Sequence, residues 1–147
     1  MTDPTAPDPF DLARFVAAQA GVYPRALAEV RAGRKASHWM WFVFPQLEGL
    51  GTSANARRYA LRDRDEAAAY LAHPLLGARL VEISGALLAF EGRTAKQILG
   101  VPDDAKLRSC ATLFAEVSTA GSVFERVLDR YFAGARDPET LRRLPPR

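Results

Sequence analysis

Apolar residues recur along most of this chain at the three- and four-residue spacing of one helix face. The clearest stripe lies between Pro74 and Gly92, at Leu76, Leu80, Ile83, Leu87 and Phe90. Strict alternation of apolar and polar residues, which is typical of strands, is nearly absent. The pattern therefore predicts an all-α domain of about eight or nine short to medium helices.

Capping and breaking residues set the expected bounds of these helices. Side chains that can cap a helix N-terminus precede apolar runs at Asp8, Ser53, Ser122 and Asp137. Prolines and glycines close the segments. The helices predicted in this way cover residues 9–19, 23–33, 53–59, 63–71, 74–91, 94–99, 102–117, 122–132 and a final segment after 137.

Residues 38–44 are the one ambiguous segment. Their aromatic and β-branched content suits a strand, yet Ser37 could cap a short buried helix that Pro45 ends. We favour the helix, because a strand here would lack an evident partner. On a helix Trp39 and Trp41 cannot share one face, so one would lie in the core and the other at a pocket. Only a strand would let both rings form a single platform.

Length and composition narrow the class of protein. The 147 residues are most simply one domain, residues 9–144, between a flexible segment 1–8 and a tail 145–147. The lone Cys110 cannot form an internal disulfide, and no Cys/His cluster has zinc-ligand spacing, so we expect a reducing, cytoplasmic setting and no metal or cofactor.

Charge and hydropathy exclude two kinds of partner. No apolar run approaches the ~20 residues of a membrane span. The net charge of +3 is dispersed along the chain, so we expect neither a membrane nor a nucleic-acid partner. The oligomeric state is left open by the sequence.

Two polar side chains on apolar helix faces are candidate site residues. Lys106 begins the stripe that continues through Cys110 and Leu113, and Gln19 extends the stripe of Leu12 and Phe15. A buried ammonium or amide needs a partner, which is a protein group or a ligand. Each also has a structural alternative, because the lysine can extend its head to solvent and the glutamine can bridge helix ends.

The segment 35–46 holds the other candidates. His38 could act as a general acid or base, or be a hydrogen-bonded core residue. The two indoles could stack on an aromatic ligand or belong to the core. His73, which precedes Pro74 at a helix junction, is expected to satisfy backbone groups there.

Several motifs carry a family resemblance. They are Lys35-x-Ser37-His38-Trp39-Met40-Trp41-Phe42-Val43-Phe44-Pro45-Gln46, then Gly49-Leu50-Gly51 with Ser53, Tyr70-Leu71-x-His73-Pro74, Asp104-x-Lys106-Leu107-Arg108-Ser109 and Leu128-Asp129-Arg130-Tyr131-Phe132. In these the chain resembles the bacterial domain-of-unknown-function family 1810 across residues 8–144, which implies a mainly α-helical single domain without an assigned activity. A more distant similarity to the NADAR proteins implies a helical enzyme that acts on N-glycosidic linkages of ADP-ribose and related nucleotide derivatives.

Together these observations predict a pocket with His38 as its catalytic residue, lined by Gln19, Lys35, Trp39, Trp41, Gln46 and Lys106. The expected ligand is a small anionic aromatic molecule such as a nucleotide derivative. In N-glycosidic hydrolysis a tryptophan would stack on the base, and Lys35 or Lys106 would neutralise the phosphate. His38 or a carboxylate such as Glu48 would position the attacking water.

The alternative is a non-enzymatic interaction or regulatory module in which the aromatic residues are core. Convergence of His38, Gln19 and Lys106 on one cavity would favour the ligand, and their separation would favour the module.

Overall fold

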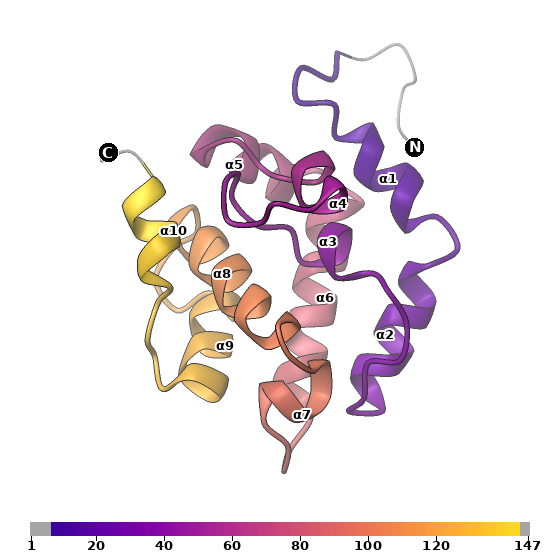
Figure 1. Ribbon diagram of the computed structural model, residues 1–147, viewed down its shortest axis with the longest axis vertical. Coiled ribbons are helices and arrows are strands. Elements are labelled where there is room, and N and C mark those ends of the chain that lie inside the picture. The colour runs from indigo at the N-terminus through magenta and orange to yellow at the C-terminus, as the bar shows by residue number, and fades with distance from the viewer. Residues whose placement is uncertain (1–6, 145–147) are drawn as a thin grey trace.

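The chain folds as a cluster of short helices. The computed structural model describes residues 7–144. Within this range the chain forms ten helices, whose arrangement can be followed in Figure 1: α1 (Ala13–Gln19), α2 (Tyr23–Arg31), α3 (Met40–Val43), α4 (Ala54–Arg58), α5 (Arg64–Ala72), α6 (Leu76–Ala89), α7 (Ala95–Leu99), α8 (Asp103–Glu116), α9 (Val123–Phe132) and α10 (Pro138–Arg143). The only β-type pairing within residues 7–144 is a parallel bridge between Leu47 and Leu61, which lie in the segments before and after α4. The predicted all-α class is confirmed. Of the two ends predicted to be flexible, residues 1–6 and 145–147 lie outside the described range.

The predicted helix starts agree well with the structure. Five caps accept a hydrogen bond from the backbone N–H three residues on: Ser53, Asp63, Thr94, Ser122 and Asp137. α1 differs, because it begins at Ala13 after a turn in which Asp11 has a φ of 50°, and not at Pro9. Asp8 still caps this end, since its carboxylate accepts from the N–H groups of Leu12 (2.8 Å) and Ala13 (2.9 Å).

The helix favoured for the ambiguous aromatic segment is present over Met40–Val43, and residues 38, 39 and 44 lie outside it. In α3 the N–H of Val43 donates to the carbonyl of Trp39 at 3.1 Å and closes the turn. Ser37 does not cap this helix, contrary to the prediction. Its hydroxyl donates to the carboxylate of Glu29 at 2.6 Å instead, which draws it away from the helix end.

α6 is the central helix of the domain. It packs against α2, α5 and α9, and it runs behind the middle of the molecule in Figure 1. Most of its predicted stripe is buried, and only Phe90, just past its end, is half-buried. α8 packs against α5, α7, α9 and α10 and closes the core from the other side. The largest buried side chains come from different parts of the chain and include Phe15, Trp39, Phe44, Tyr70 and Phe114.

No single helix in residues 7–144 is long and apolar enough to cross a membrane. α5 and α6 would reach that length and composition together, but they are bent by 87° at the break between them.

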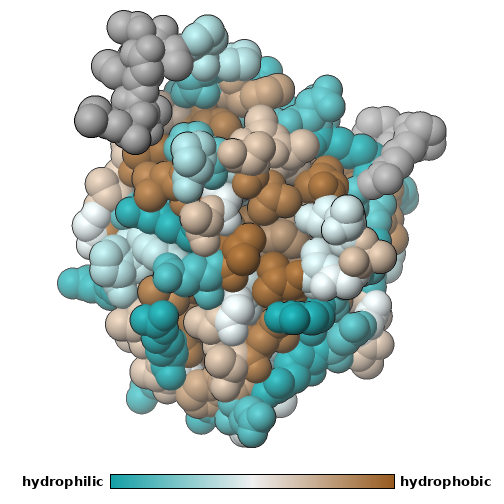
Figure 2. All heavy atoms as spheres, turned by 180° about the vertical axis from the view of Figure 1, so that it is seen from behind, coloured by the Kyte–Doolittle hydropathy of each residue, from teal (hydrophilic) through white to brown (hydrophobic). Residues whose placement is uncertain are grey.

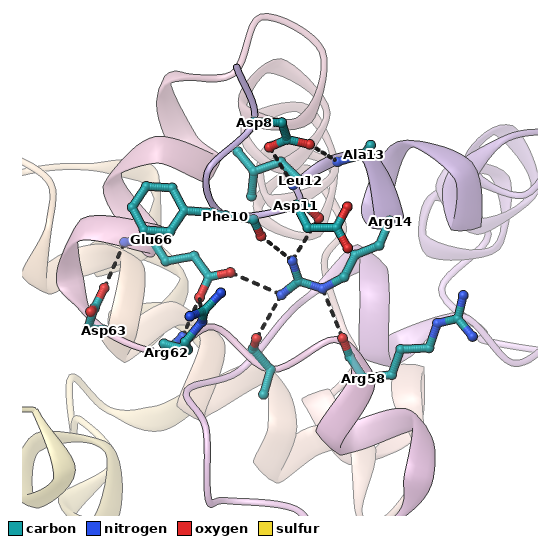
Figure 3. Close-up of polar contacts among 11 residues, drawn as sticks. Asp8, Phe10, Asp11, Leu12, Ala13, Arg14, Arg58, Arg62, Asp63 and Glu66 are labelled. Carbon is teal, nitrogen blue, oxygen red and sulfur yellow. Dashed lines mark hydrogen bonds and ion pairs between the residues drawn. The ribbon is translucent and has the colours of Figure 1, made fainter. Parts of the chain in front are cut away.

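Arg14 connects α1 to the segments around it. Figure 3 shows its guanidinium at the centre of a group of carbonyl and carboxylate oxygens. It donates five hydrogen bonds of 2.6–3.0 Å, to the carbonyls of Phe10, Asp11, Arg58 and Ala60 and to Glu66. The Glu66 side chain is fully buried, so this ion pair neutralises a charge inside the fold.

We predict that Arg14→Met lowers the free energy of unfolding by about 3–5 kcal/mol, because it removes the cation that hydrogen-bonds the buried Glu66 carboxylate and leaves only the longer, exposed contact with Arg62. The matched control is Arg62→Met, since the Arg62 side chain lies 3.8 Å from the same carboxylate but is 63% exposed. The control should cost about 1 kcal/mol or less. Urea titration measures both values, and equal losses would contradict the role given to Arg14.

Candidate functional site

One cavity of about 460 Å³ lies between α3, α4, α8 and α10 and the segment that joins α3 to α4. Figure 1 shows α3, α4 and α8 close together in the middle of the molecule. Much of the wall is apolar and includes Trp41, Phe44, Leu50 and Tyr59. The polar side chains on it include Gln46, Lys106, Ser109, Asp137 and Glu139. An apolar cavity with a few polar groups is the usual form of a small-molecule site.

A carboxylate of α2 holds the segment that precedes α3. Glu29 accepts hydrogen bonds from the N–H groups of Ala36 (2.7 Å) and Ser37 (3.0 Å), the Ser37 hydroxyl (2.6 Å) and the Trp39 indole (2.9 Å). Burial alone would raise the pKa of Glu29, but these hydrogen bonds outweigh burial and lower the pKa to about 2. The ionised carboxylate therefore fixes the place at which α3 begins.

The two tryptophans point in different directions, the division that a helix predicts. Trp39 is 0% exposed and packs against Phe44 with ring centres 6.2 Å apart. Trp41 is half-buried and lines the cavity. Trp39 is the N-cap residue that precedes α3, and Trp41 is the second residue of this helix, so the two side chains leave the chain on either side of the helix start.

Lys35 and Lys106 share one carboxylate. The Lys35 and Lys106 ammonium groups lie 3.0 Å and 3.4 Å from different oxygens of Asp103. Lys35 also lies 5.3 Å from the ring centre of Trp39, and Lys106 lies 5.3 Å from that of Trp41. The face of an indole ring attracts a positive charge, so each ring stabilises the ammonium group beside it. Only Lys106 lines the cavity, and Lys35 belongs with the buried indole.

Gln19 lies outside this cavity. Its side chain is buried, and its amide nitrogen donates to the carbonyl of Phe42 (2.7 Å) and to the hydroxyl of Tyr70 (3.1 Å). Its amide oxygen accepts from the guanidinium of Arg79 at 3.3 Å. Protein groups thus satisfy the hydrogen bonds of the amide. Gln19 links helices within the fold, which is the alternative to ligand binding.

His38 is exposed and does not line the cavity either. Its neighbours Ser37 and Trp39 both turn toward Glu29, so the side chain between them faces solvent. Glu48 is likewise exposed and outside the lining. The predicted convergence of His38, Gln19 and Lys106 is therefore absent, and the predicted residues that do share the cavity are Trp41, Gln46 and Lys106.

His73 has the structural role predicted for it. Its Nδ1 accepts from the backbone N–H groups of Leu75 (3.1 Å) and Leu76 (3.2 Å), at the start of α6. These N–H groups have no partner within their own helix, so the imidazole replaces a cap.

Asp137 lines the cavity, but sequence reasoning did not select it as a site residue. Its carboxylate caps α10 through Thr140 and accepts from the Ser109 hydroxyl at 2.9 Å. Burial raises the pKa of Asp137, but hydrogen bonds from Thr140 and Ser109 outweigh burial, and the net pKa is lowered. The Asp137-Pro138 pair identified a helix start. Nothing in that local pattern indicates which distant residues the cap faces.

The described residues hold no group of three or more His, Cys, Asp or Glu side chains arranged to bind a metal ion. Cys110, the one cysteine of the chain, is buried in α8, and burial raises the pKa of its thiol.

Comparison with known proteins gives two matches. The profile of the family described as "Protein of unknown function (DUF1810)" matches residues 9–144. The crystal structure of the conserved hypothetical protein Rv1873 from Mycobacterium tuberculosis has a TM-score of 0.91 and 52% sequence identity, and the match covers 93% of this chain and 98% of that one. No curated protein matches the chain.

We predict that Glu29→Gln lowers the free energy of unfolding near neutral pH by about 1–2 kcal/mol, allowing for solvent screening at this half-buried group. The folded-state pKa of about 2 lies below the ordinary value of 4.5, so this contribution is present above about pH 4.5 and lost as the pH falls toward 2. Urea titrations from about pH 7 down to about pH 3 should show the difference between wild type and variant shrinking.

Glu91→Gln is the control for this pH series, because Glu91 is exposed and just past the end of α6. Its effect should stay small at every pH. A Glu29→Gln effect that does not change with pH would show that the carboxylate charge is not what holds the segment.

Proposed function

We propose that this chain, which belongs to the DUF1810 family, binds a small aromatic molecule in the cavity beside Trp41. The observation that carries the proposal is the meeting of Trp41 from α3, Gln46 from the segment after it and Lys106 from α8 in one cavity. Its volume of about 460 Å³ suits a ligand with one or two rings.

The three side chains offer complementary contacts. The half-buried Trp41 ring gives an aromatic ligand a stacking surface, and Tyr59 adds a second aromatic side chain to the wall. Gln46 can donate and accept hydrogen bonds, which suits the edge of a heterocycle. Lys106, held over Trp41, can donate to an acceptor on the ligand.

The ligand class that we propose is a nucleoside or one of its derivatives, nucleotides and ADP-ribose included, and the proposed reaction is hydrolysis of the N-glycosidic bond. His38 is exposed and lies outside the cavity, so we propose that a different side chain positions the water that attacks the bond. The carboxylates on the cavity wall are Asp137 and Glu139, and Asp137 is the one fixed by a buried hydroxyl. Release of free base from a nucleoside or ADP-ribose, followed by chromatography, tests the reaction separately from binding.

We also propose a cytoplasmic location. The support is the lone, buried Cys110, which fits a reducing compartment. Fractionation of cells that express the full chain tests it.

A protein-interaction module is the second candidate, and a different surface favours it. Figure 2 shows apolar side chains gathered near the middle of the face behind α6. A shallow depression between α6 and the segments before α6 and α9 is lined by Leu71, Ala78, Val81 and Val123, and Val81 is 45% exposed. Contiguous exposed apolar surface of this kind is typical of contact sites. The separation of Gln19 and His38 from Lys106 also counts toward this candidate.

We predict that a thermal-shift screen against nucleosides, nucleotides and ADP-ribose finds a ligand. At about 100 times its dissociation constant a ligand adds about 2.7 kcal/mol, which raises the melting temperature by roughly 5–10 °C for a chain of this size. Lys106→Met should reduce the shift, and Lys96→Met, which changes an exposed lysine of α7, should leave it unchanged. A screen in which no compound raises the melting temperature would contradict the proposal and favour the interaction module.

A further inference from the structure

The charges on the cavity wall do not suit a strongly anionic ligand. The lining contains one cation, Lys106, and two carboxylates, Asp137 and Glu139. Lys106 is already paired with Asp103 at 3.4 Å, and Glu139 is paired with Arg142 at 2.7 Å. Among the described residues the lining therefore offers a phosphate group no unpaired cation, although phosphate sites usually supply several.

Asp137 is instead positioned to receive hydrogen-bond donors. The Ser109 hydroxyl (2.9 Å), the Thr140 N–H (3.2 Å) and the Thr140 hydroxyl (2.6 Å) all donate to its Oδ2. These bonds and one from the Glu139 N–H fix the side chain. The two oxygens of a carboxylate have about four acceptor positions, so the ionised group can still accept from a ligand. An ionised carboxylate only accepts, so it selects hydroxyl or amino groups and repels phosphate.

Asp137, which accepts hydrogen bonds, and Lys106, which donates them, lie close together on the cavity wall. Ser109 follows Lys106 by three residues on α8, so their Cβ atoms lie on one face about 5–6 Å apart. Ser109 in turn contacts Asp137. A single small ligand can therefore reach both, with an acceptor toward Lys106, a donor toward Asp137 and its ring beside Trp41.

We infer that the ligand of this cavity is an uncharged aromatic heterocycle with hydroxyl or amino groups, of which a nucleoside is the test case, and that phosphate esters bind less well. The inference rests on the proposed function and narrows it. ADP-ribose and other polyanionic derivatives, which the sequence suggested, fall outside the preferred class.

Isothermal titration of the full chain with the four common ribonucleosides and their 5′-mono- and diphosphates tests this inference. At least one nucleoside should bind, and each added phosphate should leave its affinity unchanged or reduce it. A diphosphate that binds about tenfold more tightly than its nucleoside would overturn the inference and leave the proposed function intact. Failure of all twelve compounds would overturn it too, and the proposed function would fall only if the thermal-shift screen also finds no ligand.

Asp137→Asn gives the second arm of the test. Asparagine is also a good N-cap, so α10 should form, while the charge is removed. Nucleoside affinity should fall about tenfold or more, and the diphosphate should lose less. The matched control is Asp63→Asn, which makes the same change at the N-cap of α5, outside the cavity lining. Equal affinities in the two variants would overturn the role given to Asp137.

Discussion

The hydrogen bonds of the Glu29 carboxylate organise the segment on which the candidate site depends. Glu29 accepts hydrogen bonds from Ala36, Ser37 and the Trp39 indole, and these bonds set the start of α3. Trp39 lies in the core just before this four-residue helix, and Trp41, inside it, lies on the cavity wall. The aromatic wall of the cavity thus follows from a carboxylate that does not itself line it.

Buried polar side chains elsewhere in the domain serve the fold. Arg14 and Glu66 join α1 to α5, and Gln19 joins α1 to α3 and α5 through Phe42 and Tyr70. In both groups protein atoms meet the hydrogen-bonding needs, as is usual for buried polar groups. Lys106 differs, because its ammonium lies over the Trp41 ring on the cavity wall and its side chain is 26% exposed. This difference in surroundings separates the proposed ligand contacts from the structural ones.

Local signals in the sequence predicted the fold well and the site in part. Ser53, Asp63, Thr94, Ser122 and Asp137 cap helices because capping is a property of a few neighbouring residues. Whether Gln19 meets a ligand or the carbonyl of Phe42 depends on residues more than twenty positions away, which helical spacing cannot reveal. His38 faces solvent for the same kind of reason, since Glu29 of another helix fixes the residues on each side of it.

The central claim is that the fold assigns one indole to the core and the other to a ligand. The two indole N–H signals in a ¹⁵N-labelled sample measure it directly during titration with a nucleoside such as adenosine. The account predicts that the Trp41 signal moves with ligand concentration, while the Trp39 signal, held by Glu29, stays in place. A bound ligand that moves the Trp39 signal and leaves Trp41 unchanged would contradict it.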